Sequence, residues 1–423
     1  MKSILDKLGL YLLFLIISVI PFHFWASDFG IFVFYREIIA IGFFILLISN
    51  LLLHRHLSLR IRKELFFIIL FPILLCIAAL YDPMINLYSR GSLENITNDA
   101  LTLDPRIYVL RNSFLYLPMV LYFSNRGITE NEIKQIAIIS VAIAPFSILF
   151  YLLNILEESA FSIFLLGEMS EIGGGVIEYN SYVPYLSFPV TSGIFLLLDR
   201  QSMALKLLIL LSITIVSIFV FLSSSRQTLL LIAIVLLSFL LLDQSSKKTT
   251  KIIMFSLVAF VIFGTYEFIM SGYDLNERLM QKYSGGPNYR FETMSDGLNR
   301  LGFLDYIKGA GLTSVLVSGP HNDYIRWTQR VGLFIMIIGF IPYFSAAYKC
   351  FIKTLNDRND TVTCYIGLAI FYIIYHSVFG YPREDAYQAV WSFLGITLWL
   401  GYTKNNKDSI FSNKRSTKVV SAI

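Results

Sequence analysis

Charged residues are scarce in this chain. Asp, Glu, Lys and Arg make up only 15% of its 423 residues, whereas soluble domains contain about 25%. Basic residues exceed acidic ones by 34 to 29, and the resulting net charge of +5 is too small to indicate nucleic-acid binding. The composition therefore argues against a soluble protein built around one core.

Cysteine is also scarce, and the common catalytic motifs are absent. Cys76, Cys350 and Cys364 lie in or near apolar runs, so they predict packing residues and neither a disulfide framework nor a metal cluster. The sequence has no P-loop, no dinucleotide-binding turn, no His-Glu-x-x-His pair and no nucleophile elbow. It also lacks an Asp-x-Asp pair that would hold a metal and a nucleotide sugar. We therefore expect no metal and no cofactor.

Long hydrophobic runs are abundant. Hydrophobic residues make up 56% of the chain, and its mean hydropathy is +0.66. A helix needs roughly 20 apolar residues to cross a bilayer, and on that basis we expect an all-α integral membrane protein with about 12 transmembrane helices. The predicted spans are residues 7–26, 30–53, 64–81, 107–124, 133–154, 178–198, 203–222, 227–243, 250–270, 331–352, 361–380 and 386–403.

These spans divide the chain into four parts. Residues 1–270 are expected to form a transmembrane bundle of spans 1 to 9, and residues 271–330 a long periplasmic catalytic loop that contains amphipathic helices. Spans 10 to 12 follow in residues 331–403, and residues 404–423 form a cytoplasmic tail. The first run is too long for a signal peptide, so it is interpreted as a signal anchor.

The distribution of basic residues predicts the orientation of the spans. Lys and Arg gather in alternate loops, while the opposite loops are acidic or long. Because basic residues favour the cytoplasmic side, both termini are expected in the cytoplasm of a multi-pass inner-membrane protein, with the long loop in the periplasm. The basic positions include Arg55, Arg60, Arg62, Lys63, Arg200, Lys206, Lys247, Lys248, Lys251, Lys349, Lys353, Arg358, Lys404, Lys407, Lys414, Arg415 and Lys418.

His321 lies in the most polar stretch of the long loop, residues 283–327. Gly319 and Pro320 precede it, and the following residues predict a helix that starts at this point. A helix N-terminus favours a bound anion and a neutral imidazole, so His321 is a candidate general base beside a lipid diphosphate. The alternative is an interfacial histidine that hydrogen-bonds within its own loop.

Two arginines are candidate ligands for a diphosphate. Arg226 follows Ser223-Ser224-Ser225 in a tight hairpin on the predicted outer side, where a positive charge requires a partner. Arg290 precedes residues 291–301, whose apolar positions recur at helical spacing and predict an amphipathic helix on the membrane surface. Guanidinium groups bind diphosphate through paired hydrogen bonds. Alternatively, Arg226 reaches lipid phosphate, and Arg290 belongs to a solvated helix face.

Further residues are given supporting roles. Asn322, Tyr324 and Arg326 follow His321 on the same predicted helix. Tyr324 and Trp327 are interpreted as interface anchors or sugar-stacking rings, whereas His376 within a span is expected to hydrogen-bond between helices. Thr129 and Glu132 have the spacing of a capping box, which predicts a helix start there. Residues 157–180 are expected to form an external loop, either a cover for the site or a simple connector.

Three segments, in this order, carry a resemblance to a known family. They are Ser223–Arg226, then Tyr289-Arg290 leading to Lys308–Gly311, then Pro320–Tyr324 before a span that contains Gly332. Together they resemble the bacterial O-antigen polymerase and O-antigen ligase superfamily over residues 220–345. The first half of the chain is similar only as a membrane protein with many spans.

The resemblance implies an inverting, metal-independent membrane glycosyltransferase. Such an enzyme takes a glycan from undecaprenyl diphosphate at the periplasmic face and joins it to an acceptor hydroxyl. Carried over to this sequence, Arg226 and Arg290 would bind the diphosphate, and His321 would activate the acceptor. The donor, the acceptor and membrane lipids are therefore the expected partners, and a chain-length regulator is left open as another.

Three functions remain open from the sequence. A polymerase would add the glycan to a lipid-linked repeat unit, and a ligase would add it to lipid A core sugar. The stretch His321–Arg326 resembles the polymerase branch more closely, so polymerisation is preferred. A flippase for lipid-linked oligosaccharides would show repeats and charged residues at the middle of several spans. Here the polar residues concentrate at one face instead.

Overall fold

The computed structural model describes the chain in separate ranges. They are residues 2–19, 22, 35–54, 63–80, 114–156, 170–172, 175–177, 186–198, 202–222, 226–242, 295, 298–299, 301–312, 322–357, 360–379 and 393–405. Arg290, His321 and the predicted span 250–270 lie outside these ranges.

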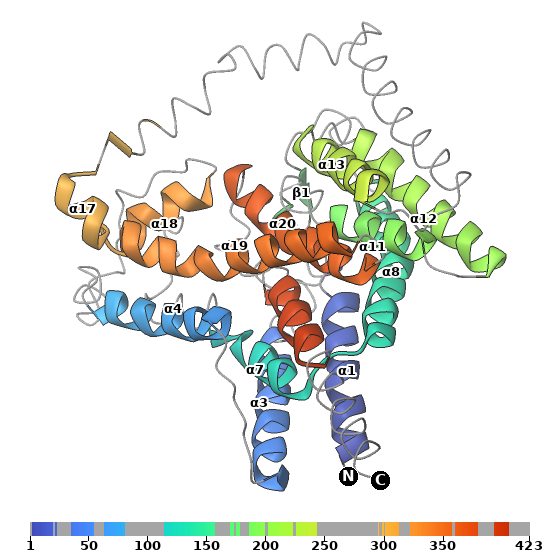
Figure 1. The fold of residues 1–423 in the computed structure, drawn as a ribbon. Helices are drawn as coiled ribbons and strands as arrows, with labels where there is room; N and C mark the ends of the chain where they lie inside the picture. Colours follow the sequence, from blue (N-terminus) through green and yellow to red (C-terminus); the bar gives the residue numbers. More distant parts are fainter. Residues whose placement is uncertain are drawn as a thin grey trace, which may run out of the picture.

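Helices account for almost all of the described residues (Figure 1). A short antiparallel hairpin, β1 (Ser170–Ile172) with β2 (Gly175–Ile177), lies within the predicted external loop 157–180. In chain order the helices are α1 (Lys2–Val19), α3 (Tyr35–His54), α4 (Lys63–Leu80), α7 (Leu117–Arg126), α8 (Glu130–Leu156), α11 (Ser187–Leu198), α12 (Met203–Leu222), α13 (Arg226–Leu242), α17 (Phe303–Lys308), α18 (Asp323–Val331), α19 (Leu333–Asn356) and α20 (Thr361–Phe379). Residues 393–405 form a further helix.

The hydrophobic runs of the sequence form helices wherever the structure describes them. Four helices within the described ranges are long and apolar enough to cross a membrane: Lys63–Leu80, Glu130–Phe150, Leu333–Asn356 and Thr361–Val378. Shorter apolar helices coincide with other predicted spans. The chain is therefore a helical protein with membrane-spanning segments, while the total of 12 spans and the periplasmic loop stay predictions.

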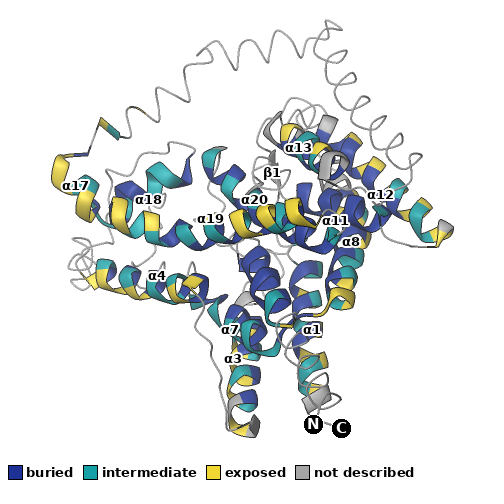
Figure 2. Cartoon of the chain, viewed as in Figure 1, coloured by how far each residue is buried: buried dark blue, intermediate teal, exposed yellow. Residues whose placement is uncertain are grey.

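The predicted span 178–198 is described as a helix only from Ser187. Pro189 lies in the first turn of α11, where a missing N–H removes no intrahelical bond. α11 is buried along its length because it packs against α8, α12, α13 and α20. Ser192 of α11 and Tyr365 of α20 share a buried hydrogen bond of 2.9 Å. This helix is the centre of the described core, which is dark blue in Figure 2.

The outer helices expose apolar side chains to the surroundings. Ile41 and Ile45 of α3 are 58% and 57% exposed, and Phe146 of α8 is 62% exposed. Other faces of the same helices are buried, with Phe43 at 1%. A helix that packs on one side and is apolar on the other fits a lipid environment.

The described helices do not share one direction (Figure 1). In Figure 1, α4 and α19 lie side by side across the view, whereas α1 and α3 run upright. Helix pairs pack at several preferred crossing angles, and the hydrophobic pattern of a sequence does not specify which angle a pair adopts.

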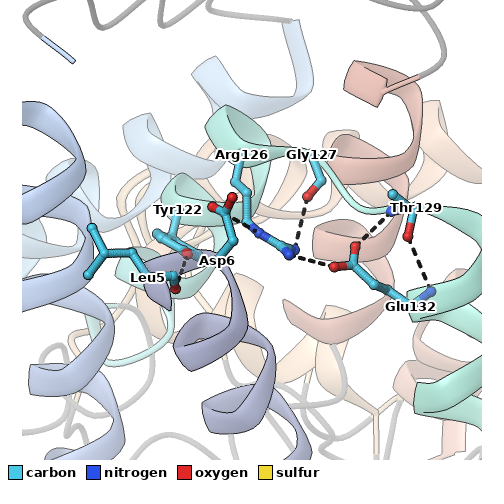
Figure 3. A network of polar contacts seen from close by, with 7 residues as sticks. All are labelled: Leu5, Asp6, Tyr122, Arg126, Gly127, Thr129 and Glu132. Atoms are coloured by element: carbon cyan, nitrogen blue, oxygen red, sulfur yellow. Dashed lines mark hydrogen bonds and ion pairs between the residues drawn. The ribbon is translucent and has the colours of Figure 1, made fainter. Parts of the chain in front are cut away.

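One set of helix ends is held together by ion pairs around Arg126 (Figure 3). The Arg126 guanidinium at the end of α7 pairs with Asp6 of α1 at 3.4 Å and with Glu132 of α8 at 2.5 Å. Glu132 and Thr129 also exchange side-chain and backbone hydrogen bonds of 2.9 and 3.3 Å. The predicted capping box at the start of α8 is thereby confirmed.

A second ion pair joins α19 to the start of α20. Lys353 Nζ lies 2.6 Å from Asp360 Oδ2, and Asp360 Oδ1 accepts a hydrogen bond of 2.9 Å from the backbone N–H of Thr363. Lys353 also lies over the Tyr402 ring at 5.0 Å. Burial raises the pKa of the Asp360 carboxyl, but hydrogen bonds from Lys353 and Thr363 outweigh it, so the pKa lies below its usual value.

A third ion pair lies between α4 and α19. Buried Glu64 accepts hydrogen bonds from Lys349 and from Ser345. All three ion-paired groups join helix ends that the charge pattern places on the same, cytoplasmic side. The orientation of these ends in a cell stays a prediction.

Candidate functional site at the start of helix α18

α18 begins two residues after His321. Asn322 is its N-cap, and the Asn322 side-chain oxygen accepts a hydrogen bond of 3.0 Å from the backbone N–H of Ile325. The predicted helix start is therefore present, although the first helical residue is Asp323 and His321 itself lies outside the described residues. The cap satisfies one of the backbone N–H groups that a helix start leaves unpaired.

The start of α18 is fastened to the last turns of α20. Asn322 Nδ2 donates to the Val378 carbonyl at 3.1 Å, and the Tyr324 hydroxyl donates to the Ile374 carbonyl at 3.0 Å. Both acceptors are carbonyls near the C-terminal end of α20, and Val378 is among the last four residues, whose carbonyls lack intrahelical partners. Asn322 and Tyr324, two of the predicted supporting residues, thus position this helix start.

The two aromatic rings of α18 belong to the core. The Tyr324 ring packs against Phe340 with centroids 4.5 Å apart. Trp327 is only 1% exposed and meets Phe71 edge to face at 5.4 Å. The interpretation of Trp327 as an interface anchor or sugar-stacking ring is therefore wrong, because the ring is buried in a hydrophobic cluster with Phe71 and Phe340.

Asp323 brings a buried carboxylate to this helix start. Its side chain is fully buried, and Ser377 Oγ lies 3.4 Å from Asp323 Oδ2. The positive end of the α18 dipole favours a negative charge in the first turn. Sequence reasoning gave Asp323 no role; its place directly after an N-cap residue was the available signal.

His376 lies one residue before Ser377 in α20. It is 3% exposed, and its ring lies 4.5 Å from the Tyr372 ring and 5.4 Å from the Tyr375 ring between centroids. Its Nε2 atom has no hydrogen-bond partner within the part of the chain that the structure describes. Among the described residues, the expected helix-to-helix hydrogen bond is therefore not formed through Nε2.

The other end of α18 is joined to α17 through two glycines. Gly309 and Gly332 have φ of 81° and 83°, which residues with a Cβ rarely adopt. A Cβ on Gly332 would lie 2.1 Å from the Ile307 carbonyl oxygen, and one on Gly309 would lie 2.3 Å from the Arg330 oxygen. The segment Gly309-Ala310-Gly311 thus packs directly on the junction of α18 with α19.

Backbone hydrogen bonds reinforce this junction. The Ala310 N–H donates to the Gln329 carbonyl at 2.7 Å, and the Gly311 N–H donates to the Arg330 carbonyl at 3.2 Å. The Arg330 guanidinium donates in turn to the Leu312 carbonyl. Arg330 is therefore a structural residue here, while Arg326, one turn after Asn322, is half-buried on the same helix.

The structure shows how only some of the predicted site residues lie relative to one another. Tyr324 and Arg326 lie in α18 and Asn322 caps it, while Arg226 is the first residue of α13. α20 packs against both α13 and α18, so one helix links the two elements. The distance from Arg226 to His321 and Arg290 stays untested, because the last two lie outside the described ranges.

The predicted amphipathic helix 291–301 is described at only a few positions. Residues 295, 298 and 299 are helical, and Leu301 is 7% exposed. The Tyr306 hydroxyl of α17 donates to the Leu298 carbonyl at 2.9 Å, which ties this segment to α17. Within the described ranges, no three His, Cys, Asp or Glu side chains lie close enough to hold a metal ion.

Comparison with known proteins gives a distant similarity to a bacterial transferase. No family model matches the chain. A stretch of 120 residues is 28% identical to the phospho-N-acetylmuramoyl-pentapeptide-transferase of Enterococcus hirae. The match covers 27% of this chain and 35% of that protein, so the chain spans about a third of the relative's length. The similarity is to a transferase that, by its name, moves a phosphorylated sugar derivative.

Proposed function

We propose that the chain is a membrane glycosyltransferase that polymerises a surface polysaccharide. It transfers a glycan from undecaprenyl diphosphate onto a lipid-linked repeat unit at the periplasmic face. The observation that carries this proposal is the start of α18: an Asn-capped helix fastened to α20, directly after His321. The apolar helices and the similarity to a sugar-phosphate transferase support a membrane enzyme of lipid-linked glycans.

The proposed reaction is a single displacement at the anomeric carbon of the donor sugar. The acceptor hydroxyl forms a new bond to this carbon as the bond to the diphosphate oxygen breaks, which inverts the configuration. His321 takes the hydroxyl proton as general base. Arg226 and Arg290 bind the undecaprenyl diphosphate leaving group and offset its growing negative charge.

The described residues have positioning roles in this proposal. Asn322 and Tyr324 hold the first turn of α18, which follows His321 in the chain, on α20. Asp323 supplies a buried carboxylate two residues from His321, and a carboxylate near a histidine base stabilises the imidazolium that forms. Arg326 adds positive charge on the same helix.

The name of the Enterococcus hirae relative favours a second candidate function, transfer of a sugar phosphate rather than a glycan. The two functions differ in what accumulates when the protein is missing. A sugar-phosphate transferase makes the lipid-linked sugar, so its loss leaves none. A polymerase consumes the lipid-linked unit, so its loss leaves single units.

Deletion of the gene followed by gel analysis of surface glycan tests the proposal. A single repeat unit on the lipid core is the expected result. Polymer stranded on undecaprenyl diphosphate would instead indicate a ligase, units trapped at the inner leaflet a flippase, and no lipid-linked unit a sugar-phosphate transferase. Any of these three results contradicts polymerisation.

Complementation with Arg226→Lys tests the diphosphate site. Lysine keeps the charge but loses the paired hydrogen bonds of guanidinium, so we expect short or absent polymer at normal protein levels. Glu130→Gln is the control, since the Glu130 side chain is 53% exposed and pairs only with Lys134 among the ion pairs described. Full-length polymer with Arg226→Lys would favour a lipid-contacting role for Arg226.

A further inference from the structure

α17 exposes its apolar side chains instead of burying them. Phe303, Leu304 and Ile307 are 79%, 65% and 44% exposed, and none of the residues of α17 is buried. In Figure 2, α17 is largely yellow at the edge of the molecule. A short helix in water would turn such residues toward the core, so this exposed face requires an apolar environment.

The position of α17 identifies that environment. The Ile307 carbonyl lies against Gly332, the residue directly before α19. The first residues of α19 continue the exposed apolar surface, with Leu333 at 42%, Phe334 at 65% and Ile337 at 42%. α19 is long and apolar enough to cross a membrane, so its exposed side chains face lipid, and the face of α17 is continuous with them.

We propose that α17 is an in-plane membrane anchor whose Phe303, Leu304 and Ile307 side chains lie among the lipid acyl chains beside the start of α19. Exposed Lys308 follows at the end of α17, where its ammonium reaches lipid phosphate. A second copy of the chain is the less favoured occupant, because a stable protein interface needs about 800 Å² from each partner. A six-residue helix supplies only a small part of that.

The anchor sets the depth of α18 in the membrane. The Ala310 and Gly311 N–H groups bind carbonyls of α18, and Gly309 packs on the same helix. α17 and α18 are therefore held together by contacts between backbone atoms, so their junction does not depend on the conformation of flexible side chains. When α17 lies in the lipid, the start of α18 stays at a fixed depth relative to the membrane surface. This inference does not require the proposed reaction to be correct.

Spin labelling of the full chain in vesicles of phosphatidylethanolamine and phosphatidylglycerol tests the anchor. Phe303→Cys, Leu304→Cys and Ile307→Cys are labelled one at a time in a Cys76→Ser background, because Cys76 is the exposed native cysteine. Collision rates with apolar oxygen and with a water-soluble nickel chelate are then compared. Tyr348→Cys, 66% exposed on α19, is the lipid reference, and Glu130→Cys is the water reference.

We expect the oxygen-to-nickel ratio at the three α17 positions to exceed that of Glu130→Cys several-fold and to lie below that of Tyr348→Cys. Ratios equal to the water reference would overturn the anchor. Low collision rates with both reagents would also overturn it, because they indicate that protein, such as a second copy, covers α17. Neither reading depends on glycan transfer, so failure here is distinguishable from failure of the proposed function.

Discussion

The two sets of helix ends in this protein are built from different polar contacts. At the ends around Arg126, Lys353 and Glu64, charged groups pair with opposite charges on neighbouring helices. At the seam between α18 and α20, the side chains of Asn322 and Tyr324 donate to backbone carbonyls instead. The first arrangement neutralises charge, whereas the second fixes a helix start through hydrogen bonds from neutral side chains.

We interpret the ion-paired helix ends as structural and the seam between α18 and α20 as functional. Charges that are paired within the protein cannot serve a ligand without losing their partners. A helix start held by neutral hydrogen bonds keeps its dipole for chemistry beside it. We therefore expect changes at the seam to affect the proposed glycan transfer more than stability, and changes at the ion-paired ends to affect stability alone.

The largest expected effect is on glycan transfer. His321→Ala removes the proposed base, and loss of a general base typically lowers a rate by about 10²- to 10⁴-fold. Polymer length on gels and the melting temperature in detergent are the measurements, and the melting temperature should not change. Asp6→Asn at the ion-paired end is the control. It should lower the melting temperature and leave the polymer length unchanged. Normal polymer with His321→Ala would contradict the distinction between the ion-paired helix ends and the seam between α18 and α20.

Gly332→Ala should cause the largest loss of stability. Its φ of 83° and the carbonyl of Ile307 leave no room for a methyl group, and the strained backbone alone costs about 1 to 3 kcal/mol. Thermal unfolding in detergent measures the loss. Gly302→Ala is the matched control, since Gly302 has an ordinary φ of −69°. Equal melting temperatures for the two variants would contradict the close contact of α17 with α19.

Asn322→Ala should have an effect of intermediate size on both stability and transfer. It removes both the cap of α18 and the bond to Val378, and loss of a cap costs about 1 kcal/mol. Transfer should fall more than this loss of stability accounts for, because the helix start is no longer fixed on α20. Asn322→Asp keeps the cap but loses the donor to Val378, so its transfer rate separates the two contributions. Unchanged transfer with Asn322→Ala would exclude a positioning role.

The smallest expected effect is a pH dependence at the ion-paired end. The pKa of Asp360 lies below its usual value of 3.8 in the folded protein, so the unfolded chain binds its proton more readily. The stabilisation from this carboxylate is complete above pH 3.8 and disappears as the pH falls through the folded pKa. Unfolding at pH values between 6 and about 3 should show a shallower loss for Asp360→Asn than for the unchanged chain. Identical curves would contradict the pairing with Lys353.

Local patterns in the sequence predicted local structure well. The hydrophobic runs form helices wherever the structure describes them, and the Thr129–Glu132 spacing forms its capping box. Each of these depends on residues within a few positions of one another. The start of α18 was predicted within two residues for the same reason.

Contacts between distant segments were beyond the reach of the sequence. The burial of Asp323 against Ser377, the packing of Trp327 on Phe71 and the contact of Gly332 with Ile307 all join separate elements. An aromatic residue near a span end has the same pattern whether a neighbouring helix covers it or lipid surrounds it. The roles of Arg226, Arg290 and His321 stay predictions that the variants above test.

The glycine contact between α17 and α18 also determines the distance that the residues before His321 have to span. Leu312 is held beside Arg330 at one end of α18, and Asn322 caps the other end. With 9 residues in α18, these points lie only about 13 Å apart along its axis. Residues 313–321 could reach about 30 Å when extended. We therefore expect that insertions or deletions of a few residues before Pro320 leave both helices in place.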